Sequence, residues 1–179
     1  HTWTCPAFRE LFDRHIPGWA NEPELFVRVD NVPDDDVWAA HQTAKSQLIE
    51  LVRERTGTVL DPDVLTLGFA RRAASYKRAD LIFSDLDRLR RIGRGKLQIV
   101  YAGKAHPADT MGKELIQSVV HSLEALEGDI TGVFVPGYDM ALAAVLVPGV
   151  DVWLNNPIRP QEAVRDEWNE GSSQRCAQF

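Results

Sequence analysis

The sequence of 179 residues predicts an α/β fold with a parallel, doubly wound sheet, preceded by a helical leader. From residue 64 onward, short apolar runs alternate with stretches of helical period, which is the pattern of βαβ units. Before that point we find only helical patterns. We therefore expect a helical segment over 1–60, an α/β domain over 61–163, and a tail over 164–179 that has no amphipathic period.

The leader is predicted to contain two helices. The first begins at Thr4-Cys5-Pro6, where a cap precedes a proline, and it ends before Pro17-Gly18. Its apolar residues share one helical face: Phe8, Leu11, Phe12 and Ile16. The second begins at Pro33, carries acidic residues 34–36 in its first turn, and ends before Gly57.

The α/β domain is predicted to contain four strands and three connecting helices. The strands are expected at 64–70, 97–102, 130–135 and 150–154, and the helices at 76–92, 111–126 and 140–147. Four such strands usually adopt the order 3-2-1-4, in which the direction of winding changes between the first strand and the fourth. Ligands bind at that switch point, beyond the carboxyl ends of the strands.

Two polar segments follow the strands that flank the switch point. The segment GFARRAASYKR, residues 68–78, concentrates four cations in a chain of net charge −6: Arg71, Arg72, Lys77 and Arg78. We place it at the N-terminus of the helix 76–92, whose unpaired N–H groups favour a phosphate-like anion; the alternative is a solvated basic helix start. The loop at 153–162 is dense in hydrogen-bonding side chains. Together the two segments predict a site for an anion and a sugar-type ligand.

Composition and missing motifs narrow the function further. The acidic balance disfavours general binding to nucleic acid or anionic membranes. Two cysteines, with no run that resembles a membrane span or a secretory signal, lead us to expect a cytoplasmic protein. The sequence has no GxGxxG, Walker or HExxH motif, so neither a standard nucleotide fingerprint nor a metal site is expected. We interpret the histidines as surface or supporting residues: His15, His41, His106 and His121.

Four stretches of this chain form a highly specific set. They are TWTCPAFRELFDRHIPGW, LGFARRAASYKRADLIFSDLDRL, IVYAGKAHPADTMGKELI and GYDMALAAVLVPGVDVWLNNPIRPQEA. This set resembles the α-glucan (glycogen, starch or maltodextrin) phosphorylases, most strongly their bacterial and archaeal members, over residues 1–163. The resemblance implies an incomplete, Rossmann-like C-terminal domain of a glycosyltransferase-B fold, so we expect the chain to be a piece of a longer protein.

The resemblance also implies an activity and roles for residues. Such enzymes use pyridoxal 5′-phosphate (PLP) and inorganic phosphate to release glucose 1-phosphate from α-1,4-glucan ends, with retention of configuration. By the resemblance, Arg72 and Lys77 hold the substrate phosphate, whereas Arg71 and Tyr138 lie near the cofactor. The implied substrate-binding residues are Glu162, Asn155 and Lys104. From the residues alone, the turn Gly103-Lys104-Ala105 is either a tight βα turn or part of the rim of the site.

The sequence departs from the family after Glu162-Ala163. The family continues SGTSGMKAALNGALNF, in which the lysine forms the Schiff base to PLP, whereas this chain reads VRDEWNEGSSQRCAQF. Back-translated with free choice of synonymous codons and read one base later, the tail spells SGTSGMKAALNGALN. We interpret 164–179 as a one-nucleotide frameshift that removes the cofactor lysine, and we expect a disordered tail and an inactive chain.

Two other functions stay open at this point. One is a nucleotide-sugar glycosyltransferase of the same fold, similar to glycogen synthases, which also place Arg and Lys after the corresponding strand. The Gly-Met-Lys sequence in the shifted frame argues against this alternative, because those transferases have no PLP lysine. The other is a non-catalytic module that binds an anion or a glucan.

The frameshift leads to a prediction about the coding DNA. Trp168, Asn169 and Glu170 leave little codon freedom, and they yield Gly-Met-Lys when read one base later. Sequencing the DNA of the tail should therefore reveal these three residues in the shifted frame. A shifted frame that encodes anything else at these positions would contradict the interpretation.

Overall fold

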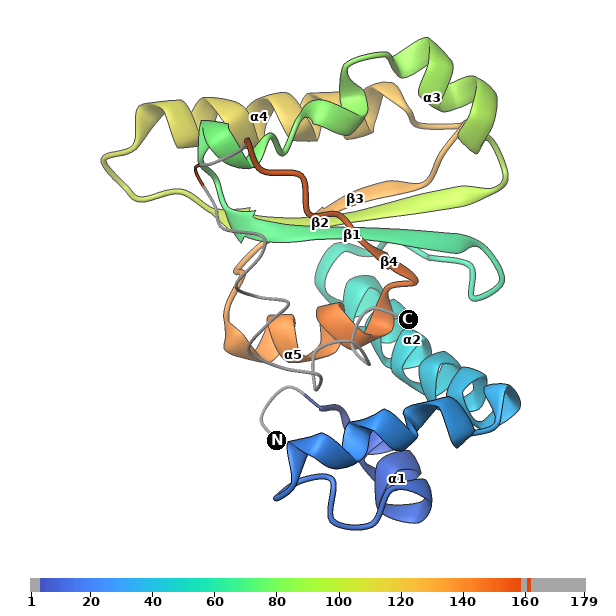
Figure 1. The fold of residues 1–179 in the computed structure, drawn as a ribbon. Coiled ribbons are helices and arrows are strands. Elements are labelled where there is room, and N and C mark those ends of the chain that lie inside the picture. Colours follow the sequence, from blue (N-terminus) through green and yellow to red (C-terminus); the bar gives the residue numbers. More distant parts are fainter. Residues whose placement is uncertain (1–3, 159–160, 162–179) are drawn as a thin grey trace.

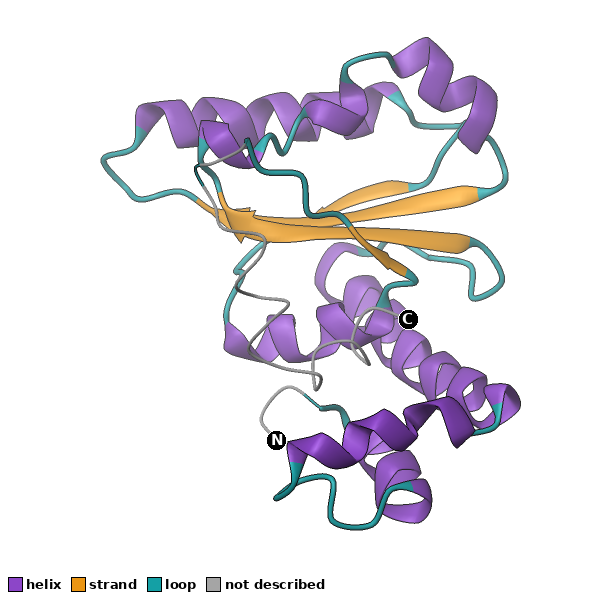
Figure 2. Ribbon diagram, in the orientation of Figure 1, coloured by secondary structure: helices purple, strands orange, loops and turns teal. Residues whose placement is uncertain are grey.

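The computed structural model describes residues 4–158 and 161, and its centre is a four-stranded, all-parallel sheet (Figures 1 and 2). Its strands are β1 (Leu65–Arg72), β2 (Leu97–Lys104), β3 (Gly132–Val135) and β4 (Val152–Trp153). Their order is β3-β2-β1-β4. The predicted α/β class and the predicted order 3-2-1-4 are therefore confirmed, and the switch point lies between β1 and β4.

Helices cover both faces of the sheet. The helices α3 (Leu86–Gly93) and α4 (Thr110–Ala125) lie on one face, and α2 (Asp34–Thr56) and α5 (Met140–Gly149) lie on the other (Figure 1). Successive strand residues point to opposite faces, so each strand contributes to two cores. The α3–α4 side buries Phe69, Ile99 and Tyr101, among others. The α2–α5 side buries Ala70, Val100, Leu142 and Leu146, among others.

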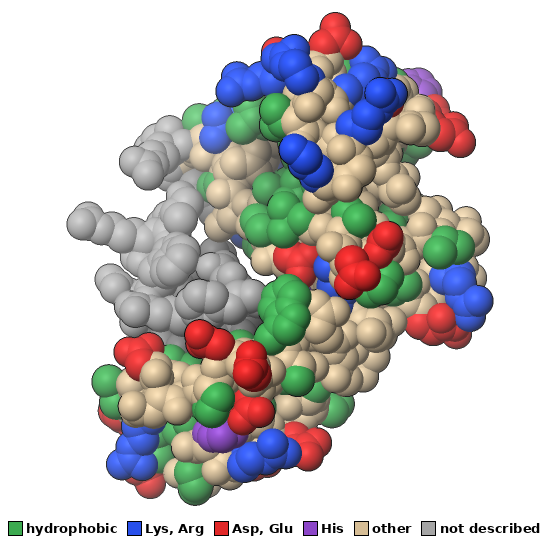
Figure 3. Space-filling view, turned by 90° about the vertical axis from the view of Figure 1, so that its right-hand side faces the viewer, with side chains coloured by type: hydrophobic (Ala, Val, Ile, Leu, Met, Phe, Trp, Pro, Cys, Tyr) green, Lys and Arg blue, Asp and Glu red, His purple; other side chains and the backbone are tan. Residues whose placement is uncertain are grey.

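The leader forms a third, aromatic core beside the first half of α2. The helix α1 (Pro6–His15) and a 3-10 helix over Pro23–Asn31 enclose it. Phe12, Trp19 and Phe26 contact one another edge to face, with ring centroids 5.2–5.6 Å apart. Both predicted leader helices are confirmed, and α2 ends at the left-handed Gly57. Seen from the end where the strands begin, Lys and Arg side chains gather mainly over the α3–α4 layer (Figure 3).

The predicted continuous helix over 76–92 is wrong. This segment contains two short 3-10 turns, Ser75–Lys77 and Leu81–Phe83, and the α-helix α3 begins only at Leu86. Arg78 adopts a left-handed conformation with φ 48°, which interrupts any α-helix at that point. The basic segment therefore does not sit at a helix N-terminus, and the expected contribution of helix N–H groups to an anion site fails with it.

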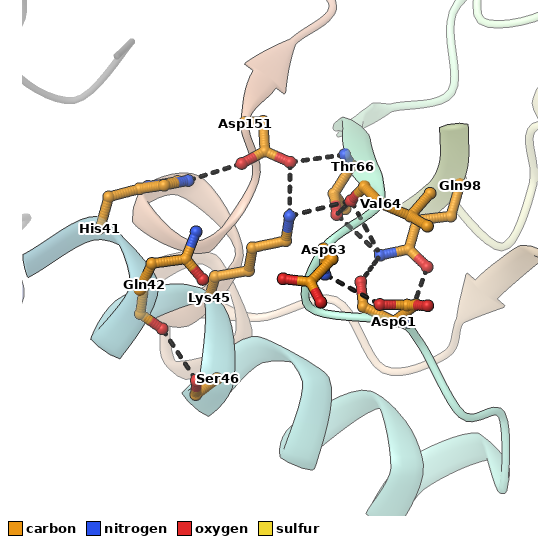
Figure 4. A network of polar contacts seen from close by, with 10 residues as sticks. All are labelled: His41, Gln42, Lys45, Ser46, Asp61, Asp63, Val64, Thr66, Gln98 and Asp151. Carbon is orange, nitrogen blue, oxygen red and sulfur yellow. Dashed lines mark hydrogen bonds and ion pairs between the residues drawn. The ribbon is translucent and has the colours of Figure 1, made fainter. Parts of the chain in front are cut away.

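A largely buried carboxylate joins α2 to the end of the sheet where β1 and β4 begin (Figure 4). Asp151 lies just before β4, and its Oδ1 is 2.7 Å from Nε2 of His41. Its Oδ2 accepts hydrogen bonds from Nζ of Lys45 at 2.8 Å and from the backbone N–H of Thr66 at 2.6 Å. Both α2 side chains are buried, each only 2% exposed. The α2 helix, β1 and β4 are thus tied together through one side chain.

The same end of the sheet holds a buried amide. Nε2 of Gln98 donates to the carbonyl of Asp61 at 2.8 Å and to Oγ1 of Thr66 at 2.9 Å. Its Oε1 accepts from the N–H of Asp61 at 3.0 Å. Lys45 Nζ also donates to the carbonyl of Val64 at 2.9 Å. Each of these contacts fixes the segment that enters β1, because buried polar groups are stable only when they are paired.

The network sets the pKa of Asp151. Burial by itself would raise the pKa of this carboxyl, but the hydrogen bonds from His41, Lys45 and Thr66, together with the charge of Lys45, lower it to about 2. A carboxyl whose pKa is lower in the folded than in the unfolded state stabilises the fold above the unfolded pKa. That stabilisation is lost as the pH falls through the folded pKa.

We predict that Asp151→Asn lowers the free energy of unfolding by about 3 kcal/mol or more at pH 7, because Lys45 is then buried without its counter-charge. The difference from the unsubstituted chain should shrink by about 2 kcal/mol as the pH falls from about 5 to about 2. Urea unfolding at several pH values measures both effects. Asp87→Asn, which removes an exposed partner of Arg90, is the control and should change little. Equal effects of the two substitutions would contradict the prediction.

Candidate functional site

The carboxyl ends of β1 and β2 place cations side by side. In the parallel register, Arg71 pairs with Gly103 and Arg72 with Lys104. The pairing extends one step further, because the N–H of Ala73 donates to the carbonyl of Lys104 at 3.1 Å. A Cβ at position 103 would lie 2.5 Å from the carbonyl oxygen of Arg71, so this close approach of the two strands requires glycine. Arg72 and Lys104 are exposed on adjacent strand ends.

The turn that follows β1 carries the next cation. Lys77 ends the 3-10 turn Ser75–Lys77, and its Nζ lies 5.3 Å from the centroid of the Tyr76 ring. The hydroxyl of Tyr101 on β2 donates to the carbonyl of Ala79 at 2.7 Å and holds the end of the turn against the sheet. The positive charge here comes from side chains on a strand end and a tight turn, without a helix N-terminus.

The loop after β4 lies against this turn. Arg78 Nε donates to the carbonyl of Asn156 at 2.6 Å, and Nδ2 of Asn156 donates to the carbonyl of Arg78 at 3.0 Å. The N–H of Ile158 donates to the carbonyl of Tyr76 at 2.8 Å. The predicted meeting of the two polar segments at the switch point is therefore confirmed, although they are almost eighty residues apart in sequence.

Tyr138 lies in the loop between β3 and α5 and is partly buried against the α2–α5 core. Burial raises the pKa of its phenol above the ordinary value, and the positive charge of Arg71 offsets part of that rise. Arg71 is thus close enough to Tyr138 to act on its titration. The two residues assigned to the cofactor by resemblance lie on different elements, Arg71 at the end of β1 and Tyr138 in the loop after β3.

Two predicted site residues remain, Asn155 and Glu162. Asn155 lies in the loop after β4, where its Oδ1 is buried and finds no partner among the described residues. Glu162 and the expected frameshifted tail lie outside the described residues. No group of three potential metal ligands occurs within 4–158 or at 161, and no helix there is long and apolar enough to cross a membrane.

The histidines occupy different environments, and His106 lies in the loop two residues beyond Lys104, at the carboxyl end of β2. His41 is buried and supports Asp151 at the opposite end of the sheet, which is the second of the two roles predicted for it. His15 pairs with Asp36 in the leader at 3.0 Å. His106 and His121 are exposed, as predicted. Sequence reasoning missed the partnership of His41, Lys45 and Asp151, whose signal was a pair of polar residues on the apolar face of α2.

Fold and site together define an α/β domain with a cationic edge at its switch point. No protein-family model matches the chain. The chain is 39% identical to glycogen phosphorylase of Aquifex aeolicus and 40% identical to maltodextrin phosphorylase of Thermococcus litoralis. It is 38% identical to glycogen phosphorylase of Mycobacterium tuberculosis. Each match covers 90% of this chain but only 21–27% of the relative.

These relatives confirm the predicted resemblance. The chain belongs to the α-glucan phosphorylase family, and it spans about a quarter of the length of the members that it matches. The fold agrees with this assignment, because its parallel sheet has the strand order expected for an incomplete Rossmann-like domain.

We predict that Arg71→Met raises the pKa of Tyr138, because the substitution removes the positive charge that favours the phenolate. Ultraviolet or NMR titration of the three tyrosines measures this, and Tyr138→Phe identifies the signal. Arg88→Met, on the exposed side of α3, is the matched control and should leave the titration unchanged. An unaltered pKa of Tyr138 in Arg71→Met would contradict the prediction and show that the two residues do not interact.

Proposed function

We propose that this chain is the phosphate-holding part of an α-glucan phosphorylase, an enzyme that releases glucose 1-phosphate from glucan ends. The observation that carries the proposal is the convergence of Arg72, Lys77 and Lys104 on the carboxyl edge of β1 and β2, beside the loop after β4. Relatives named glycogen phosphorylase and maltodextrin phosphorylase support the substrate class.

In the proposed reaction, Arg72 and Lys77 hold inorganic phosphate by charge-assisted hydrogen bonds. A phosphate O–H gives its proton to the glycosidic oxygen, the bond from that oxygen to the anomeric carbon breaks, and a phosphate oxygen bonds to the same carbon. Fixed cations lower the barrier because they stabilise the additional negative charge that develops on phosphate as it gives up its proton. Asn155, Lys104 and Glu162 are proposed to bind the sugar hydroxyls, since amide, ammonium and carboxylate groups are suited to them.

The residues present also suit one end of PLP. Arg71 supplies a guanidinium, which binds phosphate groups in a bidentate manner, and Tyr138 lies within reach of its charge. When bound, PLP would supply a second phosphate group beside the substrate phosphate. The anchoring lysine of the family is missing from this sequence in its present frame, so we propose that the chain alone is inactive.

The alternatives are now unequal. A nucleotide-sugar glycosyltransferase would use the same cations for a diphosphate, but the relatives reported above are named as phosphorylases. A module that only binds an anion or a glucan shares the proposed phosphate site and differs in catalysis alone. We also propose that the protein is cytoplasmic, as expected for an enzyme of glucan breakdown.

We predict that the chain binds inorganic phosphate and that Arg72→Ala and Lys77→Ala each weaken binding by about tenfold or more, because each removes a charge-assisted hydrogen bond. Calorimetric titration at low ionic strength measures the dissociation constants, and titration with maltooligosaccharide tests the glucan. Arg88→Ala, which removes an exposed cation of α3, is the control for net charge. Equal affinity in all variants would remove these residues from the proposal.

A further inference from the structure

Arg78 differs from the other cations of the basic segment, because its side chain is used on the protein backbone. Nε donates to the carbonyl of Asn156 at 2.6 Å, and Nη2 lies 3.5 Å from the carbonyl of Pro157. In return, Nδ2 of Asn156 donates to the carbonyl of Arg78 at 3.0 Å. A guanidinium offers several donors in a fixed plane, so it can serve two consecutive carbonyls at once.

These contacts form beyond the last backbone hydrogen bond between β4 and β1. The strand β4 pairs with β1 over two residues only, Val152 and Trp153, and the last sheet-like bond is Leu154 N–H to the carbonyl of Gly68 at 2.8 Å. Beyond Leu154 the loop is held to the turn after β1 by the Arg78 and Asn156 bonds and by Ile158, whose N–H donates to the carbonyl of Tyr76.

The backbone of Arg78 is itself in an unusual state. Its φ of 48° is the one positive φ of a non-glycine residue within the described part of the chain. Such a conformation is disfavoured for a residue with a Cβ and persists where surrounding contacts compensate for it. Here the compensating contacts are those with Asn156 and Pro157. They hold the reversal that directly follows Lys77.

We propose that Arg78 is a positioning residue of the phosphate site: it locks the turn that carries Lys77 to the loop that carries Asn155, and it does not bind the anion. The inference rests on the proposed phosphate site for its functional meaning, whereas the lock is a property of the fold. Each residue of the Arg78–Asn156 pair directly follows a proposed ligand-binding residue: Arg78 follows Lys77, and Asn156 follows Asn155. The pair therefore holds both binding residues in place.

Two substitutions separate the possible roles of Arg78. Arg78→Lys keeps the positive charge but loses the planar fork, whereas Arg78→Gly keeps the left-handed backbone and loses the side chain. In both variants we expect the amide of Ile158 to exchange hydrogen about tenfold faster or more, because the loop that carries it loses the hydrogen bond from the Arg78 guanidinium to Asn156. The amide of Leu154, which bonds to the sheet, is the internal reference and should not change.

Inorganic phosphate provides the second readout on the same proteins. Both variants should bind it about tenfold more weakly although Arg72 and Lys77 are intact, and Arg88→Lys should bind it as the unsubstituted chain does. Asn156→Ala removes the return bond to Arg78 and should shift both readouts in the same direction, which keeps the test available if Arg78→Gly fails to fold.

The outcomes are distinguishable. Full affinity in Arg78→Lys with loss in Arg78→Gly would show that Arg78 acts as a charge on the anion, and unchanged Ile158 exchange in both would show that no lock exists. Either result overturns the inference. Absence of phosphate binding in the unsubstituted chain would overturn the proposed function, while faster Ile158 exchange in the variants would still establish the lock.

Discussion

The arrangement of β4, β1 and α2 in this fold depends on the hydrogen bonds that the Asp151 carboxylate accepts. It accepts hydrogen bonds from two side chains of α2, His41 and Lys45, and from the backbone N–H of Thr66 on β1. Asp151 directly precedes β4, a strand of only two residues. A strand so short makes few ladder bonds, so the contacts of Asp151 hold β4 beside β1 together with the buried Val150 and the backbone bonds of Asp151 and Leu154. The pKa of about 2 expresses how strongly the surroundings favour the ionised form.

The position of β4 matters because the candidate site lies at its other end. The segment from Asp151 to Asn156 crosses the sheet once, held at its start by His41 and Lys45 and at its end by Arg78. Between these two anchors the chain has few residues and little freedom. The loop that lies beside the cationic edge is therefore placed by side chains from α2 and from the turn after β1 as well as by strand pairing.

Much of the fold could be predicted from local patterns. Proline and glycine at the helix ends, and apolar runs of strand length, predicted the leader helices and the strands, because those signals act within a few residues. The strand order came from the usual topology of such sheets. The helix over 76–92 failed for the opposite reason. Its periodic residues are compatible with a helix, but Arg78 is held left-handed and Tyr101 holds Ala79, and both constraints come from contacts remote in sequence.

The place of the candidate site in the fold could be predicted, whereas the long-range side-chain pairs could not. Topology alone brought the basic segment and the loop after β4 together, since the order 3-2-1-4 leaves few alternatives. The pairing of Lys45 with Asp151 was not predictable, because a lysine on a long helix normally lies in solvent and its partner is 106 residues away. Only its place on the helical face of Leu48 and Val52 indicated burial.

The absence of a helix N-terminus at the basic segment changes how the edge can hold an anion. Helix N–H groups are fixed by the helix itself, whereas Arg72 and Lys77 are long side chains that lose conformational freedom when they bind. That loss is smaller if the backbone beneath them is already rigid. Gly103 lets β1 and β2 approach closely at Arg71, the residue before Arg72, and Arg78 fixes the turn that carries Lys77. In the proposed site, rigid backbone thus takes the part that a helix terminus plays in established phosphate sites.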